Sequence, residues 1–351
     1  MSAPGITVAD MAIRLSGRPL PLAAVADVES VTVTEDLEAL SMFTLVLHNW
    51  DQDRLRVSWS DSPLFALGAE VEIALGAVGD LHRVLTGEIT GLEPTFGGDR
   101  PPMLTVRGYD RRHRLARGRR TRTFSGLTDS AIVTQVATGA RLRADVTDTG
   151  ITSEHVVQHN QTDLEFLRGR AERNGYELLV LDDVLHFHPR RHGGEPAAVL
   201  EIGREIAEFG PRLSTMDQLG ELTVRGWDTA RKEPVVGRAA ADGLRTMGGT
   251  SGPGRATGAF GAATAADVTT PVRSKALADR IATKRFEELA LGFVRGEAWC
   301  TGLPKLRAGD VVEIRGAGTT FSGRYYLTAV THSLTPGEGY RTRLDVRRNA
   351  T

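Results

Sequence analysis

The pattern G-x-x-V-E-I occurs twice in this chain, as Gly-Ala-Glu-Val-Glu-Ile at residues 68–73 and as Gly-Asp-Val-Val-Glu-Ile at residues 309–314. A second phrase, L-T-V-R-G followed by an aromatic residue and Asp, spans 104–110 and 222–228, and a weaker copy closes the chain at 344–347. Each phrase is short and apolar at alternate positions, which is typical of a half-buried strand. Two strands with similar requirements can converge, but two different recurring phrases favour an internal duplication of a small β-domain.

The overall composition is that of an ordinary globular chain without a dominant charge. Of 351 residues, 40% are hydrophobic and 25% are charged, and the formal net charge is −1. No global electrostatic field therefore attracts nucleic acid or an anionic membrane, and we expect no nucleic-acid specificity. The length predicts two or three domains.

The cysteine content and the N-terminal segment indicate in which cellular compartment the chain folds. Cys300 is the single cysteine, which excludes an intrachain disulfide and a multi-cysteine metal site. Residues 1–20 lack the pattern of a signal peptide, and no apolar run approaches the ~18 residues that span a bilayer. We expect a chain that is made and folded in the cytosol, without stable membrane insertion, and that leaves the cell by lysis or within a particle.

Short alternating segments fill the first third of the chain. Glycine, proline and acidic turns separate them, and several strands at close spacing are typical of a sandwich or barrel. We predict a first β-domain at residues 1–110. Its expected strands are 28–33, 42–47, 69–75, 83–92 and 103–109.

A segment of mixed α and β character, residues 111–205, is predicted to be an insertion after the first β-domain. Thr162 and Glu165 form a capping box, in which the Thr162 hydroxyl accepts from the Glu165 amide and the Glu165 carboxylate accepts from the Thr162 amide. This pair predicts the start of a helix.

The second β-domain, residues 206–351, is predicted to be discontinuous. Its two parts are 206–240 and 293–351, and a helix at 274–291 lies between them. The Gly-, Ala- and Thr-rich stretch 241–270 carries no helical or strand period, so we predict a mobile loop. This loop is either idle or becomes ordered when partner proteins dock.

The residues that we expect to matter are structural. Four glycines are predicted to permit turns of the β-barrels, and two large aromatic residues at matched strand ends are predicted to pack beneath each barrel. The glycines are Gly68, Gly87, Gly309 and Gly323, and the aromatic residues are Tyr109 and Trp227.

The arginine-rich run 111–122 lacks the interleaved aromatic residues that would favour nucleic-acid binding. We predict that Arg119 and Arg120 form ion pairs at an interface between chains or face a channel, because the planar guanidinium bonds carboxylates bidentately. A plain solvated surface is the alternative. On the interface prediction, reversing both charges weakens assembly and leaves the isolated fold intact.

Candidate chemistry is sparse. His186, His188 and His192 form the densest histidine cluster, but the segment is turn-like and no cysteine or suitably spaced carboxylate accompanies it, so we predict a solvated strand end and no metal. Glu72 and Glu313 match because of the duplication and not as a catalytic pair. No nucleophile elbow, zinc-protease or phosphate-loop motif is present, so we predict a non-enzymatic protein without catalytic residues or cofactors.

The order of phrases resembles that of the phage late control gene D family, the central hub proteins of contractile-tail baseplates, which are related to the hub part of VgrG-type spikes. The likeness covers about residues 65–350, and no single phrase in it is specific. The phrases that carry it are residues 85–89, 106–115, 161–167, 174–176, 224–228 and 321–342.

The resemblance implies two related antiparallel β-barrels, an α/β insertion between them and a homotrimer around an axial channel. Six similar units in a ring would adapt a sixfold tail tube to a threefold spike. The implied partners are the tail tube protein, a spike or needle-tip protein and baseplate wedge proteins. VgrG-type chains continue into a needle, whereas this sequence ends at Thr351, so we expect the needle to be a separate protein.

The implied location is a phage tail or a contractile injection particle. Two alternatives remain open from sequence: the tail-tip hub of a non-contractile phage, and a tail-associated cell-wall hydrolase.

Overall fold

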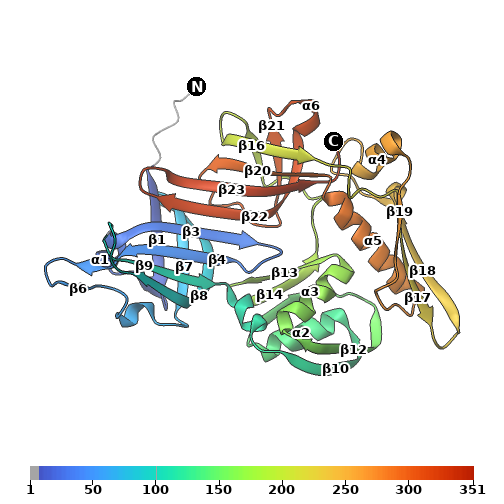
Figure 1. The fold of residues 1–351 in the computed structure, drawn as a ribbon, viewed down its shortest axis with the longest axis horizontal. Coiled ribbons are helices and arrows are strands. Elements are labelled where there is room, and N and C mark those ends of the chain that lie inside the picture. Colours follow the sequence, from blue (N-terminus) through green and yellow to red (C-terminus); the bar gives the residue numbers. More distant parts are fainter. Residues whose placement is uncertain (1–7, 100) are drawn as a thin grey trace.

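The computed structural model describes residues 8–99 and 101–351, so the start of the first predicted domain, residues 1–7, lies outside the described residues. Figure 1 shows two neighbouring groups of strands, one from the start of the chain (blue) and one from its end (red). An α/β unit lies below them, and a smaller α/β unit lies at the right of the view. The predicted fold class, mixed and mainly β, is confirmed, and the structure contains large antiparallel sheets.

One continuous sheet of thirteen strands joins both groups within the described residues. Strand β22 pairs antiparallel with β3, and this pairing connects the two groups directly. The first β-domain contributes β1 (Ala9–Leu15), β2 (Arg18–Pro19), β3 (Val28–Asp36), β4 (Met42–His48), β7 (Glu70–Ala77), β8 (Asp80–Thr95) and β9 (Met103–Tyr109). The second contributes β15 (Ala198–Glu201), β16 (Ile206–Leu213), β20 (Val294–Thr301), β21 (Val311–Arg315), β22 (Gly323–Thr335) and β23 (Gly339–Arg348).

The two β-domains repeat one strand order. The first runs β3-β4-β9-β8-β7 and the second runs β16-β20-β23-β22-β21. The two G-x-x-V-E-I phrases lead into the matching strands β7 and β21, as the duplication predicts. A bulge also recurs, between Ile89 and Gly91 in β8 and between Leu327 and Ala329 in β22. The last strand differs, because β1 joins β7 antiparallel whereas β15 joins β21 in parallel.

The copy of the second phrase at 222–228 is not part of this repeat, so the prediction that it belongs to the second β-domain was wrong. The copy at 104–110 forms β9, and the strand equivalent to β9 is β23, which holds the weaker copy at 344–347. The copy at 222–228 instead forms a separate sheet beside the second β-domain. Its sheet and helix are β17 (Glu221–Asp228), β18 (Glu233–Ala240), β19 (Thr264–Asp267) and α5 (Lys275–Leu291).

The convergence of the two L-T-V-R-G phrases has a physical reason. Leu222 and Val224 on β17 pack against Ala278, Ile281 and other apolar residues of α5. Any strand with one covered face needs apolar residues at alternate positions, so two unrelated strands can meet the same requirement. The phrase is therefore evidence for a half-buried strand and not for homology between strands.

The predicted mobile loop, residues 241–270, contains regular structure, so that prediction was wrong as well. Ser251 caps a short helix, because its hydroxyl accepts from the Gly254 amide at 3.1 Å, and Pro253 lies in the first turn. The elements in this stretch are η3 (Ala241–Gly243), α4 (Gly252–Phe260) and β19. Helix α5 begins after Ser274, as predicted.

The insertion has a hydrophobic core of its own, built from two helices and two small sheets. Strand β15, whose residues fall within the predicted insertion 111–205, belongs with the second β-domain because it pairs with β21. The elements of the insertion are η2 (Arg111–Ala116), β10 (Arg120–Thr128), α2 (Asp129–Gly139), β11 (Arg143–Val146), β12 (Thr152–Gln161), α3 (Asp163–Asn174), β13 (Tyr176–Leu181) and β14 (Val184–Pro189).

Short elements complete the described part of the chain. Phe65, the last residue of one of them, is fully buried and belongs to the core of the first β-domain together with Phe43 and Ile73. These elements are α1 (Leu22–Asp27), β5 (Trp50–Asp51), β6 (Arg56–Val57), η1 (Pro63–Phe65) and α6 (Gly318–Phe321).

Candidate functional site

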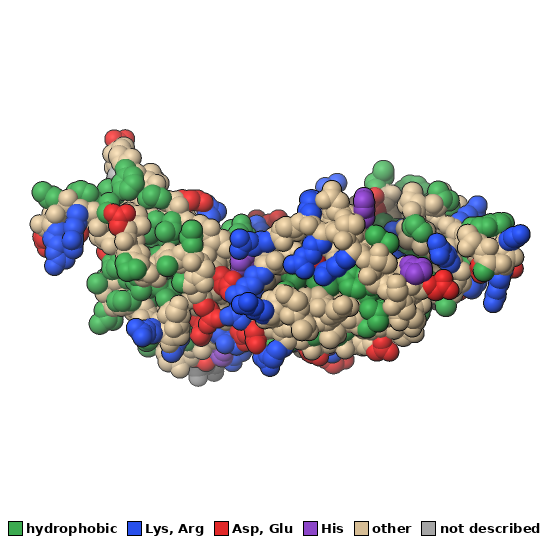
Figure 2. Space-filling view, turned by 90° about the horizontal axis from the view of Figure 1, so that it is seen from below, with side chains coloured by type: hydrophobic (Ala, Val, Ile, Leu, Met, Phe, Trp, Pro, Cys, Tyr) green, Lys and Arg blue, Asp and Glu red, His purple; other side chains and the backbone are tan. Residues whose placement is uncertain are grey.

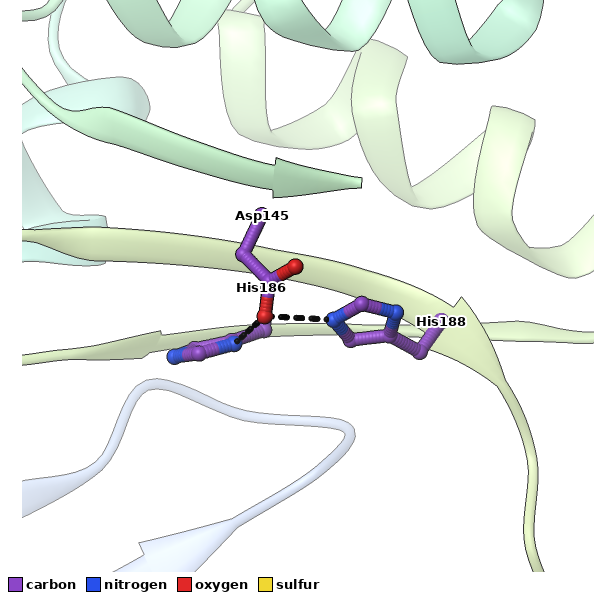
Figure 3. A group of neighbouring side chains, drawn as sticks. All are labelled: Asp145, His186 and His188. Carbon is purple, nitrogen blue, oxygen red and sulfur yellow. Dashed lines mark hydrogen bonds and ion pairs between the residues drawn. The ribbon is translucent and has the colours of Figure 1, made fainter. Parts of the chain in front are cut away.

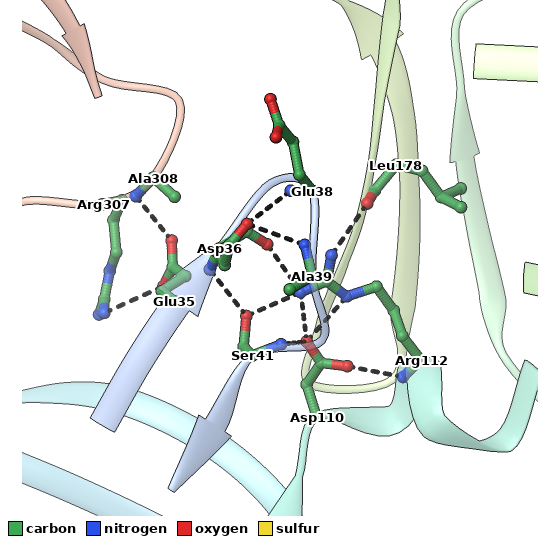
Figure 4. A network of polar contacts seen from close by, with 10 residues as sticks. All are labelled: Glu35, Asp36, Glu38, Ala39, Ser41, Asp110, Arg112, Leu178, Arg307 and Ala308. Carbon is green, nitrogen blue, oxygen red and sulfur yellow. Dashed lines mark hydrogen bonds and ion pairs between the residues drawn. The ribbon is translucent and has the colours of Figure 1, made fainter. Parts of the chain in front are cut away.

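A buried polar network joins the first β-domain to the insertion, and Arg112 is its centre (Figure 4). The Arg112 side chain is 1% exposed, and its Nε donates to Asp110 Oδ2 at 2.8 Å. Its Nη2 donates to Ser41 Oγ at 2.8 Å and to the Asp36 carbonyl at 3.0 Å, while Nη1 reaches the Leu178 carbonyl at 3.4 Å. One guanidinium thus ties the β3–β4 turn to strand β13.

A second buried contact joins the two β-domains next to their shared strand pair. Glu35, on β3, accepts from the Ala308 amide at 2.9 Å and lies 3.5 Å from Arg307 Nη1 (Figure 4). Burial raises the pKa of Glu35 to about 7, and the nearby Arg307 guanidinium opposes that rise. Arg307 Nη1 also donates to the Val84 carbonyl at 2.9 Å, so the second β-domain is held to both β3 and β8 of the first.

The arginine-rich run makes ion pairs inside the chain, which sequence analysis did not foresee. Arg111 pairs with Glu70, and His113 and Arg114 pair with Glu88. The first part of the run therefore fastens η2 to the first β-domain. The later part, from residue 119 on, fastens β10 to the start of α3.

Arg119 and Arg120, predicted to pair between chains, have carboxylate partners in their own chain. Arg119 Nη2 lies 3.0 Å from Glu165, and Arg120 Nη1 lies 3.4 Å from Asp163. Their side chains are about half exposed. Reversing their charges would place like charges beside Glu165 and Asp163 at the start of α3, so we expect a small loss of stability in addition to any effect on assembly.

The predicted capping box at the start of α3 is present. The Glu165 amide donates to Thr162 Oγ1 at 3.1 Å, and the Thr162 amide donates to Glu165 Oε2 at 3.0 Å. Because Glu165 also binds Arg119, the cap connects the helix to strand β10.

Three of the four predicted turn glycines adopt a left-handed backbone. Gly68, Gly309 and Gly323 have φ of +84°, +95° and +136°. The prediction of a turn at Gly87 was wrong, because this residue lies inside β8 opposite Val71. A Cβ there would meet the Tyr109 carbonyl oxygen at 2.7 Å, so Gly87 allows two strands to approach closely.

The two predicted aromatic residues are not equivalent. Tyr109 ends β9 opposite Met42 and is partly buried. Trp227 lies in β17, outside the second β-domain, and is 53% exposed. The prediction that Trp227 packs beneath a barrel was wrong, because the copied phrase belongs to a different sheet.

A histidine and carboxylate cluster forms where two strands of the insertion lie side by side (Figure 3). Asp145 on β11 is directly opposite His186 on β14, and one oxygen, Asp145 Oδ2, lies 3.0 Å from His186 Nδ1 and 3.0 Å from His188 Nε2. The prediction that no suitable carboxylate accompanies these histidines was wrong, because a parallel strand pair brings together residues 41 positions apart. His192 is elsewhere, with its ring against Tyr326.

Glu72 and Glu313, the matched carboxylates of the repeated phrase, lie in the matching strands β7 and β21 of different β-domains. Glu313 pairs with Arg315 at 2.7 Å. The duplication accounts for their match.

The face seen in Figure 2 carries acidic and basic side chains next to one another across its middle. This mixed pattern agrees with the net charge of −1 and with the many internal ion pairs. In the described part of the chain, none of the helices combines the length and apolar character needed to cross a membrane.

The fold defined by these two joined β-domains and their insertion is that of phage tail proteins. The 43 kDa tail protein of prophage MuSo2 from Shewanella oneidensis superposes with a TM-score of 0.72 at 17% identity, covering 97% of this chain and 98% of that one. A tail protein from Neisseria meningitidis MC58 superposes with a TM-score of 0.71 at 13% identity, covering 97% of both chains.

A third similar structure is an Escherichia coli component of the type VI secretion system, described as structurally similar to the T4 bacteriophage tail proteins gp27 and gp5. Its TM-score is 0.63 at 16% identity, with 96% of this chain and 77% of that chain covered. No curated protein sequence matches the chain. The chain belongs to the family described as the Alg8 N-terminal domain, which matches residues 6–336.

Proposed function

We propose that this protein is the structural hub of a contractile tail or contractile injection particle, of the late control gene D type. The observation that carries the proposal is the repeated strand order, which gives each chain two similar β-domains joined through β22 and β3. Three chains would supply six similar units in a ring around an axial channel.

Such a ring has the symmetry that an adaptor needs. Its pseudo-sixfold face would stack on a sixfold tail tube, and its true threefold symmetry would receive a trimeric spike. The proposed partners are therefore two further copies of the chain, a tail tube protein, a spike or needle-tip protein and baseplate wedge proteins. The fold shared with tail proteins and a type VI secretion component supports this role.

The proposed role is mechanical and not enzymatic. Two buried polar side chains, Arg112 and Glu35, connect domains to one another. Proteins that transmit force through an assembly need rigid domain junctions, and buried, fully bonded polar groups supply such rigidity.

Negative-stain imaging of the purified protein, alone and with its tube protein, tests the proposal. A hub predicts ring-shaped particles with six similar lobes and a central opening. A peptidoglycan zymogram separates the alternative of a cell-wall hydrolase, because a clear lysis band would contradict the structural role. Co-purification with a sheath protein separates a contractile particle from a non-contractile tail tip.

A further inference from the structure

The cluster of Asp145, His186 and His188 has the geometry of a metal site, and it lies apart from the domain junctions described above (Figure 3). The two histidines alternate on β14, so both side chains point to the same face of the sheet. The parallel register places Asp145 beside His186 on that face. The three potential ligand atoms lie within 4.8 Å of one another.

We propose that these three side chains bind a divalent transition-metal ion, with zinc as the best match. Two imidazole nitrogens and one carboxylate oxygen form a ligand set that zinc accepts, with a fourth position left for water. Ligand atoms around a tetrahedral zinc with bonds of about 2.0–2.2 Å are separated by roughly 3.3 Å. The two 3.0 Å separations from Asp145 Oδ2 need only a small outward movement to reach that value.

One further residue orients a ligand in the way that metal sites require. Thr147 Oγ1 lies 2.7 Å from His188 Nδ1, so a hydrogen bond there leaves Nε2 directed at the Asp145 carboxylate. Metal-binding histidines commonly engage their second ring nitrogen in a hydrogen bond that fixes the ring.

The exposure of the cluster allows an ion to enter from solution. The His186 and His188 side chains are 27% and 26% exposed, and that of Asp145 is 56% exposed. A bound ion would link β14 to β11, which lies at the edge of its three-stranded sheet. We expect the metal to hold this edge strand in place and to raise the melting temperature of the chain.

The chain supplies a matched control. His82 Nε2 lies 2.9 Å from Asp80 Oδ1, which is a similar histidine and carboxylate pair without a second imidazole. A simple ion pair needs only one histidine, whereas the cluster places two ring nitrogens on a single oxygen. Comparing the effect of substitutions at His82 with the effect of substitutions at His186 and His188 therefore distinguishes a metal site from an ordinary ion pair.

The test uses the full chain without a histidine tag, first freed of metal with a chelator. Titration with ZnCl₂ by calorimetry is expected to give one ion per chain, and CoCl₂ is expected to give the intense visible absorption of tetrahedral cobalt. His186→Ala, His188→Ala and Asp145→Asn should each weaken zinc binding by about tenfold or more, and Thr147→Val by about tenfold. His82→Ala should leave the affinity unchanged.

Circular dichroism in chelator checks that each variant is folded, and the zinc-induced rise in melting temperature of the unaltered chain gives a readout that needs no variant. Absence of stoichiometric zinc binding, or binding that survives the double change of His186 and His188 to Ala, would overturn the proposal. The result is independent of the proposed hub role, since a trimeric hub can form with or without this ion.

Discussion

Gly68 and Gly309 occupy the same backbone position in the two β-domains. Each has a left-handed φ, +84° and +95°, and each donates its amide at 2.8 Å, to the Ile89 carbonyl and to the Leu327 carbonyl respectively. The return bonds also match, because the Ile89 amide donates to Ala69 and the Leu327 amide donates to Asp310. These paired bonds come just before the bulge that recurs in β8 and β22.

Replacing either glycine with alanine should be destabilising for a backbone reason. Gly68→Ala and Gly309→Ala are each expected to lower the free energy of unfolding by about 1–2 kcal/mol, because a Cβ is unfavourable at positive φ. A Cβ at Gly68 would meet no atom within 4 Å, so crowding does not contribute there. Urea melts measure the effect.

Gly91 is the control for these two changes. It lies in β8 without a positive φ, and a Cβ added there would meet no atom within 4 Å. Gly91→Ala should therefore leave stability within about 0.5 kcal/mol of the unaltered chain or raise it slightly. Equal losses at Gly68 and Gly91 would contradict the assigned role.

Trp227→Ala should cost less than about 1 kcal/mol, because the side chain is 53% exposed and its strand lies outside the second β-domain. Phe43→Ala is the comparison, since Phe43 is fully buried in the first core and should cost about 3–5 kcal/mol. Chemical melts decide between these values. A loss of about 3 kcal/mol at Trp227 would mean that the ring is covered.

Arg112→Met should be strongly destabilising, although methionine preserves much of the side-chain volume. The change leaves the buried Asp110 carboxylate without its charged partner, and breaking a buried pair in this way costs about 3–5 kcal/mol. Arg117→Met is the control, because Arg117 is exposed in the same basic run. Similar melting curves for the two variants would show that the junction contributes little.

Glu35 should make stability depend on pH. Its folded pKa of about 7 is above the value near 4.3 of an unfolded chain, so the folded state binds the proton more tightly. The stabilisation is complete below pH ~4.3 and is lost as the pH rises through about 7. Relative to Glu35→Gln, the unaltered chain should lose about 3 kcal/mol across that window. Parallel stability profiles for the two proteins would contradict the assignment.

Reversing Arg119 and Arg120 to Glu should lower stability by about 1 kcal/mol or more, because both half-exposed arginines pair with carboxylates at the start of α3 and one of these, Asp163, is buried. Thermal melts measure this loss, and Arg117→Glu provides a control for the reversal of a single charge. Light scattering on the same variants tests the interface prediction. If the double variant folds and assembles normally, the interface prediction is contradicted, and the two arginines form ion pairs only within the chain.

Local patterns predicted local structure well. The capping box of Thr162 and Glu165 and the helix after Ser274 were predicted correctly, because each depends on residues a few positions apart. The phrase G-x-x-V-E-I also led to a true repeat, because a positive φ followed by a half-buried strand constrains both backbone and side chains.

Pairings between distant segments were not predictable in the same way. Asp145 meets His186 only through a parallel strand pair, and β15 joins β21 across more than a hundred residues. The L-T-V-R-G phrase gave a wrong prediction because alternating apolar residues indicate that one face of a strand is covered. They do not indicate which sheet the strand belongs to. Arg112 was interpreted only as a member of the basic run. Its position two residues after Asp110, at the end of a strand, is the local feature that indicates the ion pair between these two side chains.

The proposed hub requires three copies of this chain to form one ring. Light scattering coupled to size-exclusion chromatography tests it most directly, since one chain has a mass of 37.9 kDa. A trimeric hub should give a particle of about 114 kDa, three times that mass, that persists on dilution. A single species at the mass of one or two chains over the whole concentration range would contradict it.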